Sequence, residues 1–116
     1  MVKSQYVSWN EIEKTVQIIS NKISKSSKTF SSITTISRGG LIPSRLLADS
    51  LDIEKIFVDQ NIISSDSLFV DDIFDSGKTF SDVISKATDS SKLTFVTLFA
   101  RRGVSYPEQL IYGKQT

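Results

Sequence analysis

Two kinds of apolar pattern alternate along the chain. Short runs of apolar and β-branched residues are typical of strands that a parallel sheet buries on both faces, whereas apolar residues every three or four positions are typical of helices. The runs predict five strands, at residues 32–36, 55–59, 67–71, 93–99 and 109–112. Because helical segments separate most of these runs, we expect an α/β fold of three layers with a mainly parallel, roughly five-stranded central sheet.

The first helical segment carries clear start signals. Ser8 can accept a hydrogen bond from the backbone N–H of Glu11, whose side chain can return one, and Val7 can pack on Ile12 across this capping box. We expect Trp9 to anchor the first turn by packing. The buried face should continue at helical spacing through Val16, Ile19 and Ile23.

A polar turn with two glycines, Ser37-Arg38-Gly39-Gly40, joins the first strand to a second helix at residues 41–51. The glycines permit positive φ and a close approach of the backbone to a ligand, and Arg38 would present a planar, permanently charged fork. Taken alone, this stretch could equally be an ordinary glycine turn with an exposed arginine. The buried face of the second helix is expected to comprise Ile42, Leu46, Leu47 and Leu51.

Residues 68–80 carry the most informative pattern, Leu-Phe-Val-Asp-Asp-Ile-Phe-Asp-Ser-Gly-Lys-Thr-Phe. Asp71 and Asp72 stand where the predicted strand should leave the sheet, and a tight turn then leads into a helix. Such a strand–turn–helix offers unpaired backbone N–H groups and the positive end of a helix dipole, which hold phosphate. The helix is predicted from the spacing of Phe80, Val83, Ile84 and Ala87.

The side chains of this stretch suit a phosphorylated sugar. The hydroxyls of Ser76 and Thr79 can add hydrogen bonds to phosphate, and the paired aspartates can accept hydrogen bonds from sugar hydroxyls or hold a cation. A P-loop is excluded, because its pattern requires glycine where Asp72 stands. The alternative is a helix capped by Asp75 or Ser76, with both aspartates merely solvated.

Composition removes several kinds of chemistry. The 116 residues include no histidine and no cysteine, which excludes a Ser-His-Asp triad, a cysteine nucleophile, disulfides and thiolate zinc sites. A net charge of +1 gives no field that attracts nucleic acid or a membrane surface. No apolar run approaches the ~20 residues of a membrane span and no signal peptide is visible, so we expect one cytoplasmic domain over residues 1–116.

The pattern at residues 68–80 resembles the PRPP-binding signature of type I phosphoribosyltransferases: four apolar residues, two acidic residues and then Thr-Gly-x-Thr. Here Ser67 occupies an apolar position and Ser76 stands where the family usually has threonine. Ser-Arg-Gly-Gly is similar to the pyrophosphate-binding loop of the xanthine-guanine group, which implies a non-proline cis peptide between Ser37 and Arg38. The resemblance covers roughly residues 6 to 113.

This resemblance implies a purine phosphoribosyltransferase with a flavodoxin-like sheet, in which the first and third strands lie side by side. It would use Mg²⁺ to transfer the 5-phosphoribosyl group of PRPP to a purine base and release pyrophosphate. Asp71 and Asp72 would face the ribose hydroxyls directly or through the metal, and Asp75 would lie near N7 of the base. The other implied contacts are Ser76, Gly77, Lys78 and Thr79 for the 5-phosphate, Ser37, Arg38, Gly39 and Gly40 for pyrophosphate, and Arg101, in the place of a lysine, for the exocyclic oxygen of the base. We expect a homodimer or homotetramer.

Two parts of the family pattern are missing. The segment after residue 59 is too short for the long loop that closes over the reaction centre, and we expect only a brief antiparallel strand at residues 61–64. The aromatic residue that stacks on the base after the last strand is also absent, and Tyr106 and Tyr112 are the candidate substitutes.

Two other classes of protein therefore stay open. One is a PRPP- or nucleotide-binding regulatory protein with little or no turnover. The other is a response-regulator receiver, which is disfavoured because such a domain needs acidic residues after the first strand, where this chain has Ser37 and Arg38.

Overall fold

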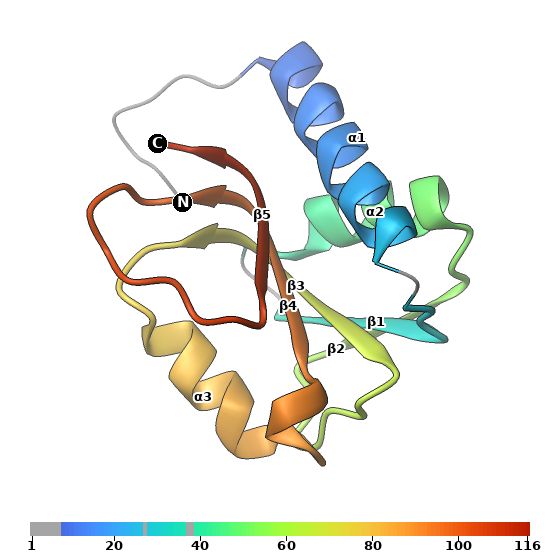
Figure 1. Cartoon of the computed structure of the whole chain (residues 1–116). Helices are drawn as coiled ribbons and strands as arrows, with labels where there is room; N and C mark the ends of the chain where they lie inside the picture. Colours follow the sequence, from blue (N-terminus) through green and yellow to red (C-terminus); the bar gives the residue numbers. More distant parts are fainter. Residues whose placement is uncertain (1–7, 27, 37–38) are drawn as a thin grey trace.

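A computed structural model of the chain describes residues 8–26, 28–36 and 39–116 (Figure 1). Its five strands form one sheet in the order β2-β1-β3-β4-β5, and all neighbouring strands are parallel. This confirms the predicted α/β fold, with its flavodoxin-like strand order and the first strand beside the third. The elements are α1 Trp9–Lys25, β1 Ser32–Thr35, α2 Leu41–Leu51, β2 Lys55–Val58, β3 Ser67–Phe74, α3 Lys78–Lys86, η1 Ser90–Lys92, β4 Thr94–Ala100 and β5 Leu110–Gln115.

Helices cover both faces of the sheet, with α1 and α2 on one side and α3 on the other (Figure 1). The core on the α1 and α2 side includes Ile19 and Leu47, both fully buried. On the α3 side the rings of Phe69 and Phe95 stack with centroids 5.1 Å apart, and Phe80 of α3 meets Phe95 edge-on. These two cores fix the sheet between its helices, so the ends of the strands are held rigidly.

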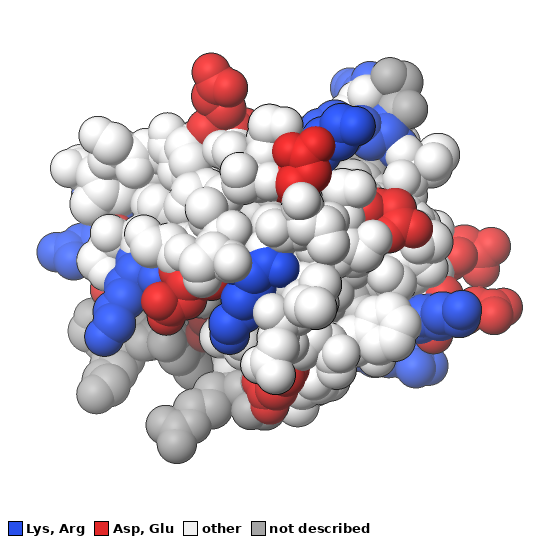
Figure 2. All heavy atoms as spheres, turned by 90° about the horizontal axis from the view of Figure 1, so that it is seen from below, with Lys and Arg blue, Asp and Glu red and all other residues white. Residues whose placement is uncertain are grey.

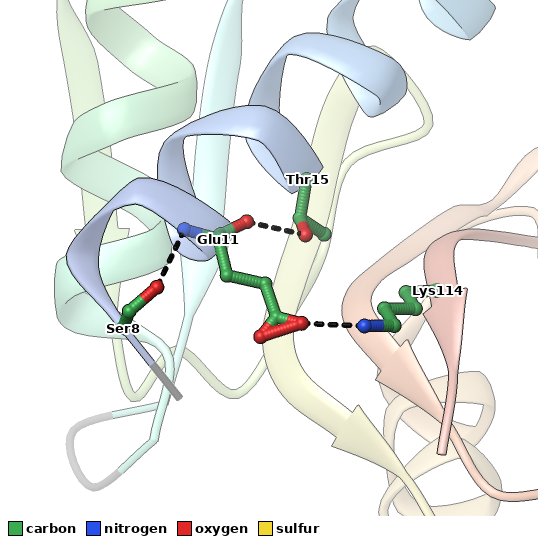
Figure 3. Close-up of polar contacts among 4 residues, drawn as sticks. All are labelled: Ser8, Glu11, Thr15 and Lys114. Carbon is green, nitrogen blue, oxygen red and sulfur yellow. Dashed lines mark hydrogen bonds and ion pairs between the residues drawn. The ribbon is translucent and has the colours of Figure 1, made fainter. Parts of the chain in front are cut away.

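Helix α1 begins at its predicted cap and is tied to β5 (Figure 3). Ser8 Oγ accepts a hydrogen bond from the Glu11 amide at 3.2 Å, and Thr15 Oγ1 donates to the Glu11 carbonyl at 2.7 Å. The Glu11 carboxylate pairs with Lys114 of β5 instead of returning to Ser8, so only half of the predicted capping box forms. The predicted packing of Val7 on Ile12 lies outside the described residues.

Three local predictions were wrong. Trp9 is 55% exposed and Ile42 is 60% exposed, because neighbouring elements cover less than half of either side chain in the first turn of its helix. Residues 61–64 do not form an antiparallel strand. Ile63 makes a parallel bridge with Ala87, and its amide and carbonyl bond to Lys86 and Thr88, so the chain turns toward the end of α3.

Charges of both signs are dispersed over the face of the molecule that Figure 2 shows. On the face in Figure 2, acidic and basic side chains alternate among neutral ones in the area that the described residues cover. Within residues 8–26, 28–36 and 39–116, no helix has the length and apolar character needed to cross a membrane.

Candidate functional site

Strand β3 extends past the end of β1. The last residue of β1, Thr35, pairs with Val70, whereas β3 continues to Phe74 along β4, which itself runs to Ala100. The prediction that β3 ends at residue 71 was therefore wrong, because β4 supplies a hydrogen-bonding partner beyond that point. Asp71 and Asp72 stand within the strand, beside the gap that β1 leaves. This gap is the topological switch point of the sheet, where such folds bind ligands.

The turn before α2 fills part of this gap. A Cβ atom on Gly39 would lie 2.6 Å from Asp72 Oδ1, and one on Gly40 would lie 1.7 Å from Thr35 Oγ1 and 2.7 Å from the Val70 carbonyl oxygen. Only glycine allows the backbone to approach β1 and β3 so closely. Two segments that sequence analysis picked out separately thus meet at Gly39 and Asp72. Ser37, Arg38 and the cis peptide implied between them lie outside the described residues.

The two aspartates differ in environment. Asp71 is only 5% exposed, and its Oδ1 accepts a hydrogen bond from the Asp72 amide at 2.8 Å. Asp72 is half-buried, and its Oδ1 accepts from the Ile73 amide at 2.9 Å. Burial raises the pKa of Asp71 to about 6, and the neighbouring Asp72 acts in the same direction, against the hydrogen bond from the Asp72 amide. A cation bound beside this pair would relieve the cost of the buried charge.

The carboxylate oxygens at this site suit Mg²⁺ when a bound ligand supplies further oxygen atoms. Mg²⁺ prefers oxygen ligands and is commonly held by one or two carboxylates together with phosphates of the substrate. Asp71 and Asp72 supply two adjacent carboxylates, and the described part of the chain holds no cluster of three or more acidic, histidine or cysteine side chains. The residues therefore fit a metal that arrives with a phosphorylated ligand.

Helix α3 starts without a side-chain cap. Gly77, at its N-cap, adopts a left-handed conformation with φ of +85°, and the first helical hydrogen bond runs from the Ser81 amide to the Gly77 carbonyl at 2.9 Å. Neither Asp75 nor Ser76 caps the helix, so that alternative was wrong. The amides at the start of α3 have the geometry that phosphate groups use at helix N-termini.

A cavity of about 820 Å³ opens at this end of the sheet, which is within the usual range for small-molecule sites. Gly39, both aspartates and the whole turn into α3 line it, and the remaining walls are apolar side chains of α1, α2, β3, α3 and β4 and of Ile36 after β1. The polar and small residues of the lining are Gly39, Asp71, Asp72, Asp75, Ser76, Gly77, Lys78 and Thr79.

Arg101 lies beside this cavity but does not line it. Its Nη1 is 2.8 Å from Asp75 Oδ1, and both side chains of this ion pair are more than half exposed. Tyr106, one of the two candidate substitutes for the stacking aromatic, packs against Phe74 and Tyr112. The structure thus gives Arg101 a protein partner at the position where sequence analysis expected a contact with the base.

The arrangement of strands, the switch-point cavity and the turn into α3 are all compatible with a phosphoribosyltransferase-like fold. No family model matches this sequence, and no curated protein matches it either. Solved structures do.

A purine phosphoribosyltransferase from Pyrococcus horikoshii has a TM-score of 0.74 at 21% identity, over 96% of this chain and 86% of that chain. The xanthine-guanine-hypoxanthine phosphoribosyltransferase of Helicobacter pylori gives 0.77 at 18% identity, over 93% and 84%. A hypothetical protein from Neisseria gonorrhoeae with bound ppGpp gives 0.71 at 16% identity, over 96% and 82%. These likenesses confirm the resemblance at the level of the fold.

Sequence reasoning missed two parts of the site. The apolar walls come from Ile12, Leu41 and Phe99, on three different elements, and no motif connects them. The pair of Asp75 and Arg101 joins residues 26 positions apart, which only the pairing of β3 with β4 brings together.

Proposed function

We propose that this protein binds PRPP and transfers its 5-phosphoribosyl group to a purine base, with release of pyrophosphate. The contact of Gly39 with Asp72 carries the proposal, since it joins a glycine turn and a pair of carboxylates at the mouth of one cavity. Neither segment alone distinguishes a ligand site from an ordinary connection. Together with the uncapped amides at the start of α3, the two segments suit a sugar that carries a phosphate at one end and a pyrophosphate at the other.

Each group has a role in this proposal. The amides and hydroxyls of Ser76, Gly77 and Thr79 bind the 5-phosphate, and Lys78 adds a positive charge beside it. Asp71 and Asp72 accept hydrogen bonds from the ribose hydroxyls, and the Gly39 and Gly40 backbone, with Ser37 and Arg38, binds pyrophosphate. Asp75 accepts a hydrogen bond from N7 of the base.

The reaction needs no covalent nucleophile. N9 of the base forms a bond to C1 of ribose, the C1–oxygen bond breaks, and pyrophosphate leaves with the electron pair, while the N7–H proton of the base passes to the Asp75 carboxylate. Positive charge develops at C1, where the carboxylates of Asp71 and Asp72 stabilise it. Mg²⁺ held by these two carboxylates would offset the charge of the leaving pyrophosphate. A chain without histidine or cysteine can carry out this chemistry.

Calorimetry with Mg²⁺ and PRPP tests the proposal. The double variant Asp71→Asn/Asp72→Asn should lose most of its affinity, because each hydrogen bond to a charged group is worth about 1.5–3 kcal/mol. Asp82→Asn, an exposed carboxylate on α3, is the matched control and should bind like the unaltered protein. Equal affinity in the double variant would refute the assignment of the two aspartates.

A second candidate is a nucleotide-binding protein that performs little turnover. It is favoured by the short connection between β2 and β3 and by the similar fold of the Neisseria protein with bound ppGpp. Binding of purine nucleotides without formation of nucleotide from PRPP and guanine, hypoxanthine or xanthine would support it. Light scattering of the same samples tests the predicted dimer or tetramer.

A further inference from the structure

A network of contacts joins the ends of β3, β4 and β5 beside the cavity. Arg101, directly after β4, donates its backbone amide to the Phe74 carbonyl at 2.8 Å and its guanidinium to Asp75 at 2.8 Å. One residue thus contacts both Asp75 and the residue before it. Arg101 therefore holds the start of the turn at Asp75 through two hydrogen bonds, one to the backbone and one to the Asp75 side chain.

Tyr106 holds Arg101 in turn. Its hydroxyl donates to the Arg101 carbonyl at 2.6 Å and accepts a hydrogen bond from Gln115 Nε2 at 3.2 Å. Its ring lies edge-on to Phe74, with centroids 5.8 Å apart and planes at 87°. Tyr106 consequently contacts both Arg101 of the ion pair and Phe74, the residue before Asp75.

Only some residues of this network line the cavity. Phe74 and Asp75 line it, whereas Arg101 and Tyr106 do not. Oδ1 of Asp75 is bonded to Arg101, and the carboxylate still has acceptor capacity for a hydrogen bond from a ligand in the cavity. Arg101 and Tyr106 can therefore influence a ligand through Asp75.

We propose that Arg101 is a positioning residue that orients Asp75 toward the N7 edge of the base, and that Tyr106 holds Arg101 for this task. The inference rests on the proposed function, which places the base beside Asp75. It differs from the expectation that Arg101 itself donates to the exocyclic oxygen of the purine. The two roles predict different selectivity at position 6 of the base.

Two nucleotide analogues separate these roles. 9-Deazainosine 5′-monophosphate and 9-deazaadenosine 5′-monophosphate both carry an N–H at position 7, but the first has oxygen and the second an amino group at position 6. Arg101→Met should weaken both about two- to fivefold, the effect of losing an exposed ion pair. Ribose 5-phosphate, which lacks the base, should bind unchanged. Tyr106→Phe should act in the same direction on both analogues.

A matched variant and a double variant complete the experiment. Arg102→Met, at the exposed residue next to Arg101, should leave all three affinities unchanged. In an Asp75→Asn background, Arg101→Met should have no further effect, because the group through which it acts is gone. Calorimetry provides each affinity, and thermal melting checks that the variants are folded.

Each other result overturns an identifiable claim. Selective weakening of the 9-deazainosine nucleotide would mean that Arg101 contacts the oxygen, and no change in either would mean that the ion pair is irrelevant. Equal weakening of ribose 5-phosphate would show a purely structural role. If the unaltered protein does not bind ribose 5-phosphate, the proposed function fails, and the inference fails with it.

Discussion

The carboxylate of Asp71 is almost fully buried and is next to a second carboxylate, that of Asp72. Its pKa is about 6 in the folded protein, above the ordinary value of 3.8 for an exposed aspartate, so the folded protein binds this proton more tightly than the unfolded chain. The contribution of Asp71 to the free energy of unfolding is therefore constant below about pH 4. It falls as the pH rises from 4 to 6 and stays low above that.

Replacing Asp71 by asparagine should remove this pH-dependent loss. Asparagine keeps an oxygen that can accept the Asp72 amide but carries no charge, so Asp71→Asn should be more stable than the unaltered protein at pH 7.5, by up to about 3 kcal/mol. The difference should shrink toward zero at pH 4. Urea unfolding at both pH values, without Mg²⁺, measures it. A variant that is less stable at pH 7.5 would contradict the cause given for the raised pKa.

Gly39 and Gly40 are adjacent but should respond differently to alanine. At Gly40 the new methyl group would overlap Thr35 Oγ1 and the backbone of β3, so Gly40→Ala should lower the free energy of unfolding by about 1–3 kcal/mol. At Gly39 the three atoms nearest to the new methyl group all belong to the Asp72 carboxylate, which is a side chain and not backbone. Gly39→Ala should keep its stability within about 0.5 kcal/mol but bind Mg²⁺–PRPP about tenfold more weakly. Urea unfolding measures the stability of both variants, and calorimetry measures their affinity for Mg²⁺–PRPP. An equal loss of stability in the two variants would contradict the different roles given to Gly39 and Gly40.

At the scale of elements, the sequence predicted most helices and strands because each carries local signals. The cap at Ser8 and the bounds of α2 follow from side chains near in sequence. The end of β3 and the path of residues 61–64 were mispredicted because they depend on distant partners, β4 and the end of α3. Exposure of Trp9 and Ile42 was missed for a similar reason, since helical spacing does not reveal which side chains the neighbouring elements leave uncovered.

The cap of α1 provides a test at this scale. Ser8→Ala removes the acceptor for the Glu11 amide and should lower the free energy of unfolding by about 1 kcal/mol. Ser24→Ala, at an exposed position in the last turn of α1, is the control and should be neutral or slightly stabilising, because alanine has a higher helix propensity than serine. Urea unfolding measures both. Equal midpoints for the two variants would show that the cap contributes little.

At the scale of the whole molecule, the meeting of the two motifs could be predicted because parallel strands bring their carboxyl ends to one edge of the sheet. Once β1 lies beside β3, Gly39 and Asp72 must be neighbours. The cavity walls and the Asp75–Arg101 pair could not be predicted, since they depend on how α1, α2 and β4 pack against that edge. The fold class could therefore be predicted from the pattern of apolar residues, whereas the details of the site depend on how distant elements pack together.

The same architecture should limit the turnover of the reaction that we propose. Residues between β2 and β3 bond to the end of α3, so the described chain offers no long loop there to cover the cavity. An uncovered site admits water and weakens each electrostatic contact with the transition state. Loss of one preorganised stabilising element costs about 10²–10³ in rate, so we expect turnover well below the ~10 s⁻¹ typical of enzymes.

Binding of PRPP should survive, because the groups proposed to hold its phosphate and ribose all lie at the cavity. Calorimetry with Mg²⁺–PRPP beside steady-state nucleotide formation from guanine, hypoxanthine and xanthine compares the two properties. Asp75→Asn is the control, since it should lower the remaining turnover while ribose 5-phosphate still binds. A turnover of tens per second would show that this open cavity excludes water well enough without a covering loop. Undetectable binding of PRPP would instead overturn the proposed substrate.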